Sequence, residues 1–133
     1  MITTALLLFA GIAFGQTLEK GNLIGVHVMK VDLKSGATLD QFINFFNEKV
    51  KPEWQKADPD MTGFIMKGIR GESTNEIGMI VQYKDEAARD KYFNDDGTQS
   101  EFYSKMMEIL TSVTSEWQKI GTYETKYTDW ILQ

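Results

Sequence analysis

One histidine offers acid-base chemistry in this sequence. His27 is the single histidine among 133 residues, and it lies in an apolar stretch that runs from Leu23 to Leu33. An imidazole, with an ordinary pKa of roughly 6.5, suits proton transfer or metal ligation. A lone histidine cannot hold zinc, which needs three or four ligands, so we expect no metal site. His27 is therefore either an acid-base group or a core histidine bonded to a neighbour such as Gln82 or Tyr83.

Polar and aromatic side chains on other predicted strands are candidates for binding a ligand. Gln82 interrupts an apolar strand, and burying its amide without a partner would cost about 1–3 kcal/mol. It should therefore bond to His27, to a substrate or to water at the strand end. Aromatic strand residues either line a pocket or pack across strands and at a dimer contact. The aromatic candidates are Tyr83, Tyr123, Tyr127 and Trp130.

Arg70, at the end of a predicted strand, could hold an anionic group or remain a solvated charge. The composition excludes several function classes. There is no cysteine, the glycines show neither dinucleotide nor Walker spacing, and no nucleophile elbow is present. The net charge of −5, with acidic and basic residues interspersed, argues against a nucleic-acid partner. We expect no cofactor.

The first residues resemble a bacterial secretory signal. An uncharged apolar run follows Met1 and ends with small residues at Ala13 and Gly15, the spacing of a cleavage site. A run of about 14 apolar residues is shorter than the roughly 20 that span a bilayer. We predict a signal peptide at 1–15, a linker at 16–22, one domain at 23–133, and a secreted or periplasmic protein without a stable membrane anchor after cleavage.

The rest of the chain alternates strand and helix patterns. A strand over Leu23–Leu33, apolar on both alternating sets, is predicted to be central and covered on both faces. Thr38 and Gln41 form a capping box before an apolar helical stripe, in which Pro52 should kink the helix or restart its last turn. The further expected elements are strands at 63–70 and 76–84 joined by a hairpin turn, a helix at 86–93, a second helix that a capping box starts at Thr98 and Gly121 closes, and a one-sided strand at 122–132.

This order predicts an α+β domain of ferredoxin-like βαββαβ topology, with a four-stranded antiparallel sheet and two helices on one face. We also expect the first and third strands to form a parallel pair at the sheet centre. Helices would cover only one face of these two apolar strands. A second copy of the sheet is the simplest cover for the other face, which predicts a homodimer with a two-fold axis.

The junction Met79–Ala88, a strand ending in an aromatic residue, a charged turn and a helix start with alanines, resembles the dimeric α/β-barrel superfamily. The similarity is to its antibiotic-biosynthesis-monooxygenase-like domains. The resemblance covers roughly 23–133 and implies the fold, the dimer and a cofactor-independent monooxygenase-like activity on a hydrophobic or aromatic substrate. Haem-using members carry a histidine on the helix after the third strand, and this chain has none there.

The functional expectation is thus an exported, homodimeric domain that binds a small apolar or aromatic molecule. If it is an enzyme, His27 is its acid-base residue, and Gln82, Tyr83, Arg70 and Tyr123 contact the ligand. The alternative is a non-enzymatic binding or stress-associated dimer with no catalytic site.

Overall fold

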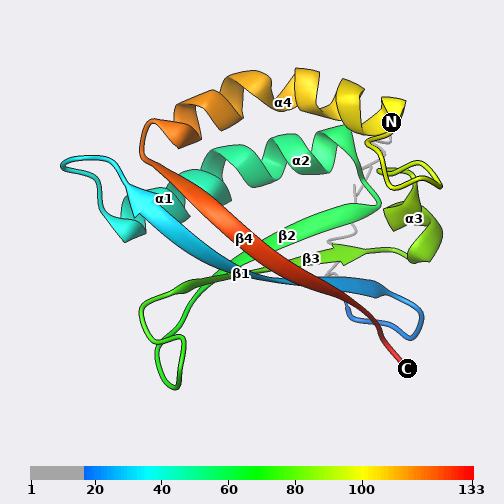
Figure 1. Cartoon of the computed structure of the whole chain (residues 1–133), viewed down its shortest axis with the longest axis horizontal. Coiled ribbons are helices and arrows are strands. Elements are labelled where there is room, and N and C mark those ends of the chain that lie inside the picture. The colour runs from blue at the N-terminus through cyan, green and yellow to red at the C-terminus, as the bar shows by residue number, and fades with distance from the viewer. Residues whose placement is uncertain (1–16) are drawn as a thin grey trace, which may run out of the picture.

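The computed structural model describes residues 17–133, and the predicted signal peptide at 1–15 lies outside the described residues. A twisted sheet carries the longer helices on one face, and the short helix α3 lies at one end (Figure 1). In chain order the elements are β1 (Leu23–Leu33), α1 (Leu39–Phe45), the π-helix η1 (Phe46–Val50), α2 (Lys51–Ala57), β2 (Met61–Lys67), β3 (Ile77–Tyr83), α3 (Glu86–Asp90), α4 (Glu101–Gln118) and β4 (Gly121–Ile131).

The strand order confirms the ferredoxin-like prediction. The four strands are arranged β2-β3-β1-β4, with β1 and β3 at the centre. Every neighbouring pair is antiparallel, so the predicted parallel pairing of the first and third strands is wrong. The reason is topological: β1 and β2 run the same way across a helical crossover, and the β2–β3 hairpin then reverses the chain.

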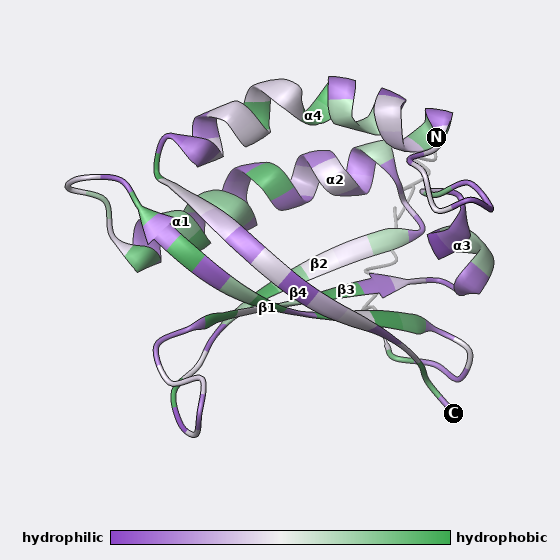
Figure 2. Ribbon diagram, in the orientation of Figure 1, coloured by the Kyte–Doolittle hydropathy of each residue, from purple (hydrophilic) through white to green (hydrophobic). Residues whose placement is uncertain are grey.

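The two faces of the sheet differ in cover. Toward the helices lie buried side chains such as Met29, Ile77 and Met79, which pack on Phe42 and Trp117. Strand side chains point to alternating faces, so the even-numbered residues of β1 face away from the helices. Val26 and Val28 are 38% and 51% exposed there, and β1 is therefore not covered on both faces by its own chain. Hydrophobic positions recur along β1 and β3 all the same (Figure 2).

The first helical segment follows its sequence signals. The Thr38 side chain accepts from the Gln41 backbone N–H at 3.2 Å, and the Gln41 side chain accepts from the Thr38 N–H at 2.8 Å. Pro52 lacks a backbone donor, and it lies in the first turn of α2, immediately after the widened turn η1. The predicted break at this proline is confirmed as a π-helical turn followed by a restart.

The start of α4 differs from the prediction. Ser100, rather than Thr98, is the N-cap, and its hydroxyl accepts from the Tyr103 N–H at 3.1 Å. The Thr98 hydroxyl instead donates a hydrogen bond of 2.6 Å to the Asp96 carboxylate, inside the turn between α3 and α4. Gly121 is the first residue of β4 and not a helix cap, because α4 ends at Gln118 with Lys119 as its C-cap.

Residues 17–22 are hydrogen-bonded to the ends of β3 and β4. The Asn22 side chain donates to the Lys84 carbonyl at 2.8 Å, and Gly21 and Leu132 are joined through their backbones. Across residues 17–133, the helices are too short or too polar to cross a membrane.

Candidate functional site

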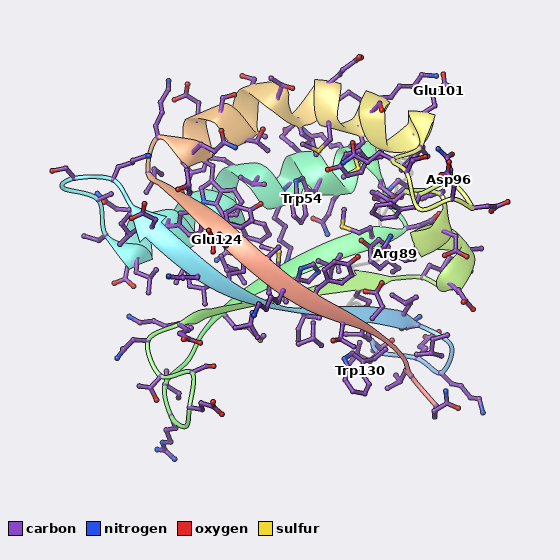
Figure 3. The ribbon with its side chains drawn as sticks, in the orientation of Figure 1. Trp54, Arg89, Asp96, Glu101, Glu124 and Trp130 are labelled. Atoms are coloured by element: carbon purple, nitrogen blue, oxygen red, sulfur yellow. The ribbon has the colours of Figure 1, made fainter. Side chains whose placement is uncertain are left out.

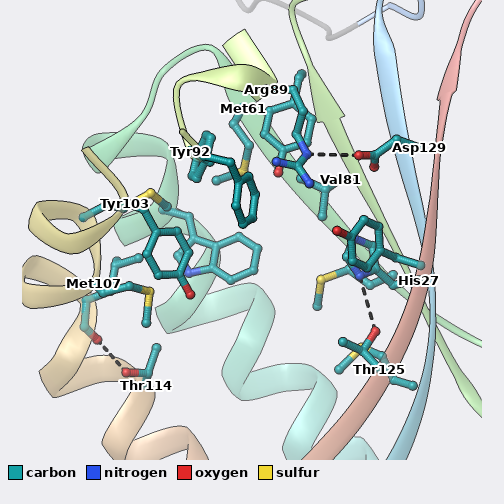
Figure 4. A pocket seen from close by; sticks show the side chains of 18 of the residues that line it. His27, Met61, Val81, Arg89, Tyr92, Tyr103, Met107, Thr114, Thr125 and Asp129 are labelled. Atoms are coloured by element: carbon teal, nitrogen blue, oxygen red, sulfur yellow. Dashed lines mark hydrogen bonds and ion pairs between the residues drawn. The ribbon is translucent and has the colours of Figure 1, made fainter. Parts of the chain in front are cut away.

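An apolar cavity of about 280 Å³ lies between the inner face of the sheet and helices α3 and α4 (Figure 4). Five methionines contribute to its wall, and polar groups are few. Its lining side chains include Met29, Met61, Met79, Met106, Met107, Trp54, Tyr103, Leu110, His27, Tyr83, Arg89, Tyr123, Thr125, Tyr127 and Asp129. Methionine is unbranched and flexible, so this wall can adapt to ligands of different outline.

Strand register builds the floor of this cavity. His27 lies between Met79 on β3 and Tyr127 on β4, and all three point inward. The next row contains Gly25 and Asp129. A Cβ on Gly25 would lie 3.0 Å from Asp129 Oδ1 and 3.2 Å from His27 Nε2. The absence of a side chain at Gly25 therefore lets the imidazole and the carboxylate converge over one point of the strand.

His27 is held at the cavity wall by two neighbours on β4. Its Nδ1 lies 3.3 Å from Thr125 Oγ1, and its ring stacks on Tyr127 with a centroid distance of 5.1 Å. Burial lowers the pKa of His27 below 6.5, the Asp129 carboxylate opposes this shift, and the Arg89 guanidinium adds to it. The imidazole is therefore neutral at pH 7, as a proton acceptor must be.

An ion pair joins α3 to β4 beside the histidine. Arg89 Nε lies 3.1 Å from Asp129 Oδ2, and the two side chains are 13% and 28% exposed. Figure 3 shows Arg89 above the sheet near the α3 end. Asp85 positions this arginine by capping α3, since its carboxylate accepts from the Ala88 N–H at 2.8 Å.

Three tyrosines at the cavity, Tyr83, Tyr92 and Tyr123, have raised pKa values. Burial raises the pKa of Tyr83 to about 12 and also raises the pKa of Tyr123. Burial, with a 2.6 Å hydrogen bond to Asp58, raises the pKa of Tyr92. The fully buried Asp58 also pairs with Lys91 at 2.8 Å, which ties the start of β2 to the segment after α3. These hydroxyls can donate hydrogen bonds but cannot act as bases near pH 7.

The structure brings three of the predicted site residues together and leaves two elsewhere. His27, Tyr83 and Tyr123 line the cavity. Gln82 points to the opposite face of the sheet, where its amide donates to Asn22 Oδ1 at 3.0 Å. The alternative in which His27 bonds to Gln82 or Tyr83 does not hold, because its Nδ1 contacts Thr125 instead. Arg70 is exposed in the hairpin between β2 and β3, away from the cavity.

Sequence reasoning missed the ion pair between Arg89 and Asp129. Arg89 and Asp129 are 40 residues apart, and nothing local in the sequence links them. Tyr127 lines the cavity as one reading of the aromatic residues had it, whereas Trp130 lies on the other side of the sheet from Trp54 (Figure 3). Within residues 17–133, no three His, Cys, Asp or Glu side chains cluster as metal ligands would.

No family model matches the sequence, and no curated protein matches it. Among solved structures, the chain is similar to SnoaB, a cofactor-independent oxygenase from Streptomyces nogalater, with a TM-score of 0.47, 11% identity, and coverage of 81% of this chain and 91% of that one. It is also similar to a dimeric protein of unknown function and ferredoxin-like fold from Bacteroides fragilis, with a TM-score of 0.39, 9% identity, and coverage of 85% and 98%.

Proposed function

We propose that this protein binds a small hydrophobic or aromatic molecule in the cavity and oxygenates it without a cofactor, with His27 as the acid-base residue. One observation carries the proposal: a neutral imidazole stands at the wall of an open, mostly apolar cavity, instead of being buried within a filled core. Cavities of this kind, with few convergent polar groups, are typical ligand sites.

A quinol is the substrate that suits this site best. Its flat ring matches the aromatic and methionine walls, and its hydroxyl offers a proton that His27 can accept. The resulting anion is electron-rich and can transfer electrons to O₂. One oxygen atom then enters the ring, the other leaves as water, and the product is a hydroxyquinone. The quinol supplies all the electrons, so no external reductant is required.

Oxygen consumption over a panel of quinols tests this activity. Wild-type protein should accelerate O₂ uptake, and His27→Ala should lower the rate by at least about a hundredfold, the low end of typical general-base contributions. Arg70→Gln is the matched control, because Arg70 lies away from the cavity, and it should retain the wild-type rate. Ligand binding with no O₂ uptake in the wild type would leave a binding protein and refute the oxygenase.

We also propose that the outer face of the sheet is the homodimer interface. Five apolar side chains on this face are more than a third exposed: Val26, Val28, Phe64, Met66 and Trp130. A contiguous apolar face of this kind marks an interaction site, and a second copy of the same sheet can cover it. Light scattering at micromolar concentration should give a dimer for the wild type and a monomer for Val28→Lys. Ile109→Lys makes the same kind of change at an exposed position of α4 and should leave the dimer intact.

Export remains part of the proposal. It rests on the apolar run at 1–15 and its small residues before Gln16. Expression of the full chain in a bacterium should give a periplasmic product whose mass corresponds to a first residue at Gln16. An uncleaved cytoplasmic product would refute export.

A further inference from the structure

The ion pair of Arg89 and Asp129 lines both the cavity and a second hollow beside it. This shallower hollow outside the cavity is lined by Glu86, Asp90 and the ion pair itself. Phe93 and Tyr127 also line both hollows. The same ion pair is therefore in reach of a ligand in the outer hollow and of a ligand in the cavity.

The Arg89 guanidinium keeps most of its hydrogen-bonding capacity. Its Nε–H bonds to Asp129, while within residues 17–133 its two terminal amino groups form no hydrogen bond. Among the described residues, every fully buried side-chain nitrogen or oxygen has a hydrogen-bond partner. The two amino groups of Arg89 have none, so they are not fully buried and can be reached from the hollows. The rings of Phe93, Tyr83 and Tyr127 surround the guanidinium carbon at 4.5, 5.7 and 5.9 Å. Arg89 is thus held in place with free donors.

The charges in the outer hollow and in the cavity favour different forms of a ligand. In the outer hollow the carboxylates of Glu86, Asp90 and Asp129 face one guanidinium, which opposes the entry of an anion. Inside, Arg89 is the one cationic side chain among the lining residues, and the remaining titratable groups besides Asp129 and His27 are tyrosine hydroxyls. An anion generated inside can accept hydrogen bonds from the unbonded amino groups of Arg89, whereas a preformed anion meets three carboxylates and one guanidinium outside.

We infer that the ligand is a phenol that enters neutral and ionises in the cavity, with His27 accepting its proton and the free amino groups of Arg89 binding the phenolate oxygen. This inference rests on the proposed function, because it uses the same cavity and the same histidine. The O–H bond of the ligand breaks, the proton moves to the imidazole, and a neutral pair becomes an imidazolium and a phenolate. Hydrogen bonds to a developing oxyanion stabilise it more in an apolar site than in bulk solvent.

A spectroscopic titration tests the inference without relying on turnover. The probe is 7-hydroxycoumarin, whose neutral and anionic forms absorb at different wavelengths, and 7-methoxycoumarin serves as the ligand that cannot ionise. With the full chain, the bound hydroxycoumarin should show a ratio of anion to neutral form at least about tenfold higher than the free probe at the same pH, a shift of roughly one pKa unit. The methoxy compound should bind without any spectral change of this kind.

Three variants assign the effect to the ion pair. Arg89→Gln should abolish the shift, Asp129→Asn should enlarge it, and Arg70→Gln should leave it unchanged. If the ion pair were only structural, Arg89→Gln and Asp129→Asn would both change the pKa shift of the bound probe in the same direction. The wild-type and Asp129→Asn measurements decide the question even where Arg89→Gln does not fold.

The two proposals fail in different ways. Bound hydroxycoumarin that ionises like the free probe would overturn the inference, while binding of the methoxy compound would still support a ligand site. Failure of both compounds to bind at millimolar concentration would contradict the ligand site and the inference with it.

Discussion

Replacing Gly25 by alanine should disturb the histidine while leaving the fold intact. The new Cβ would lie 3.0 Å from Asp129 Oδ1 and 3.2 Å from His27 Nε2, closer than ordinary contact, so both side chains must move by a few tenths of an ångström. Overpacking typically costs about 1–3 kcal/mol, and we take the low end because both close atoms are side-chain tips. Replacing glycine restores about 0.4–1 kcal/mol through the unfolded chain.

The net loss of stability should therefore be below about 1 kcal/mol, a change in Tm of less than about 5 °C for a chain of this size. The pKa of His27 should fall further. Asp129, which opposes the lowering, is pushed away, and the added methyl group removes more water.

The assay is an NMR titration of the one imidazole, with a protein that carries no polyhistidine tag. Gly78→Ala is the control, because its Cβ would meet Met66 Cε at 3.1 Å on the outer face of the sheet. An unchanged or raised pKa of His27 in folded Gly25→Ala would refute the reasoning about this convergence.

Three further outcomes follow from the contacts. Asp58→Ala should lower the free energy of unfolding by about 3 kcal/mol in urea titrations, because it leaves the Tyr92 hydroxyl and the partly exposed Lys91 without their partner. Asp40→Ala is the control: it removes an exposed ion pair and should cost less than about 1 kcal/mol. The folded-state pKa of His27 lies below its unfolded value of 6.5. The contribution of His27 to the free energy of unfolding is therefore complete above pH 6.5 and is lost as the pH falls through the folded-state pKa. His27→Gln should therefore flatten the acid side of the Tm curve, and an unchanged slope would contradict this. Since the pKa of Tyr83 is raised to about 12, Tyr83→Phe should leave the tyrosinate absorbance at pH 10 unchanged.

Most of the fold could be predicted because local signals agreed with one another. The span of β1 and the capping box at Thr38 were read directly from apolar alternation and side-chain chemistry. The start of α4 was missed because Thr98 and Ser100 both fit a cap, and only the bond from Thr98 to Asp96 selects the serine.

The site could be predicted only in part. His27 stood out by residue type, but whether Gln82 shares its face depends on the register between β1 and β3, and a shift of one residue would exchange the faces. The pairing of Arg89 with Asp129 depends on how α3 lies over an edge strand, which no local pattern encodes. Glycine at position 25 gave no signal, since its role is the space that it leaves.

The alternation along β1 has a thermodynamic consequence. Val26 and Val28 point to the proposed dimer face, and His27, between them, points into the cavity. A shift of this strand on association would also move the imidazole, and the dimerisation equilibrium would then be linked to ligand affinity. Linkage is reciprocal: the factor by which a partner subunit changes the affinity for the ligand is the factor by which the ligand changes dimerisation. Dilution, which dissociates the dimer, would then change the affinity of the cavity for its ligand.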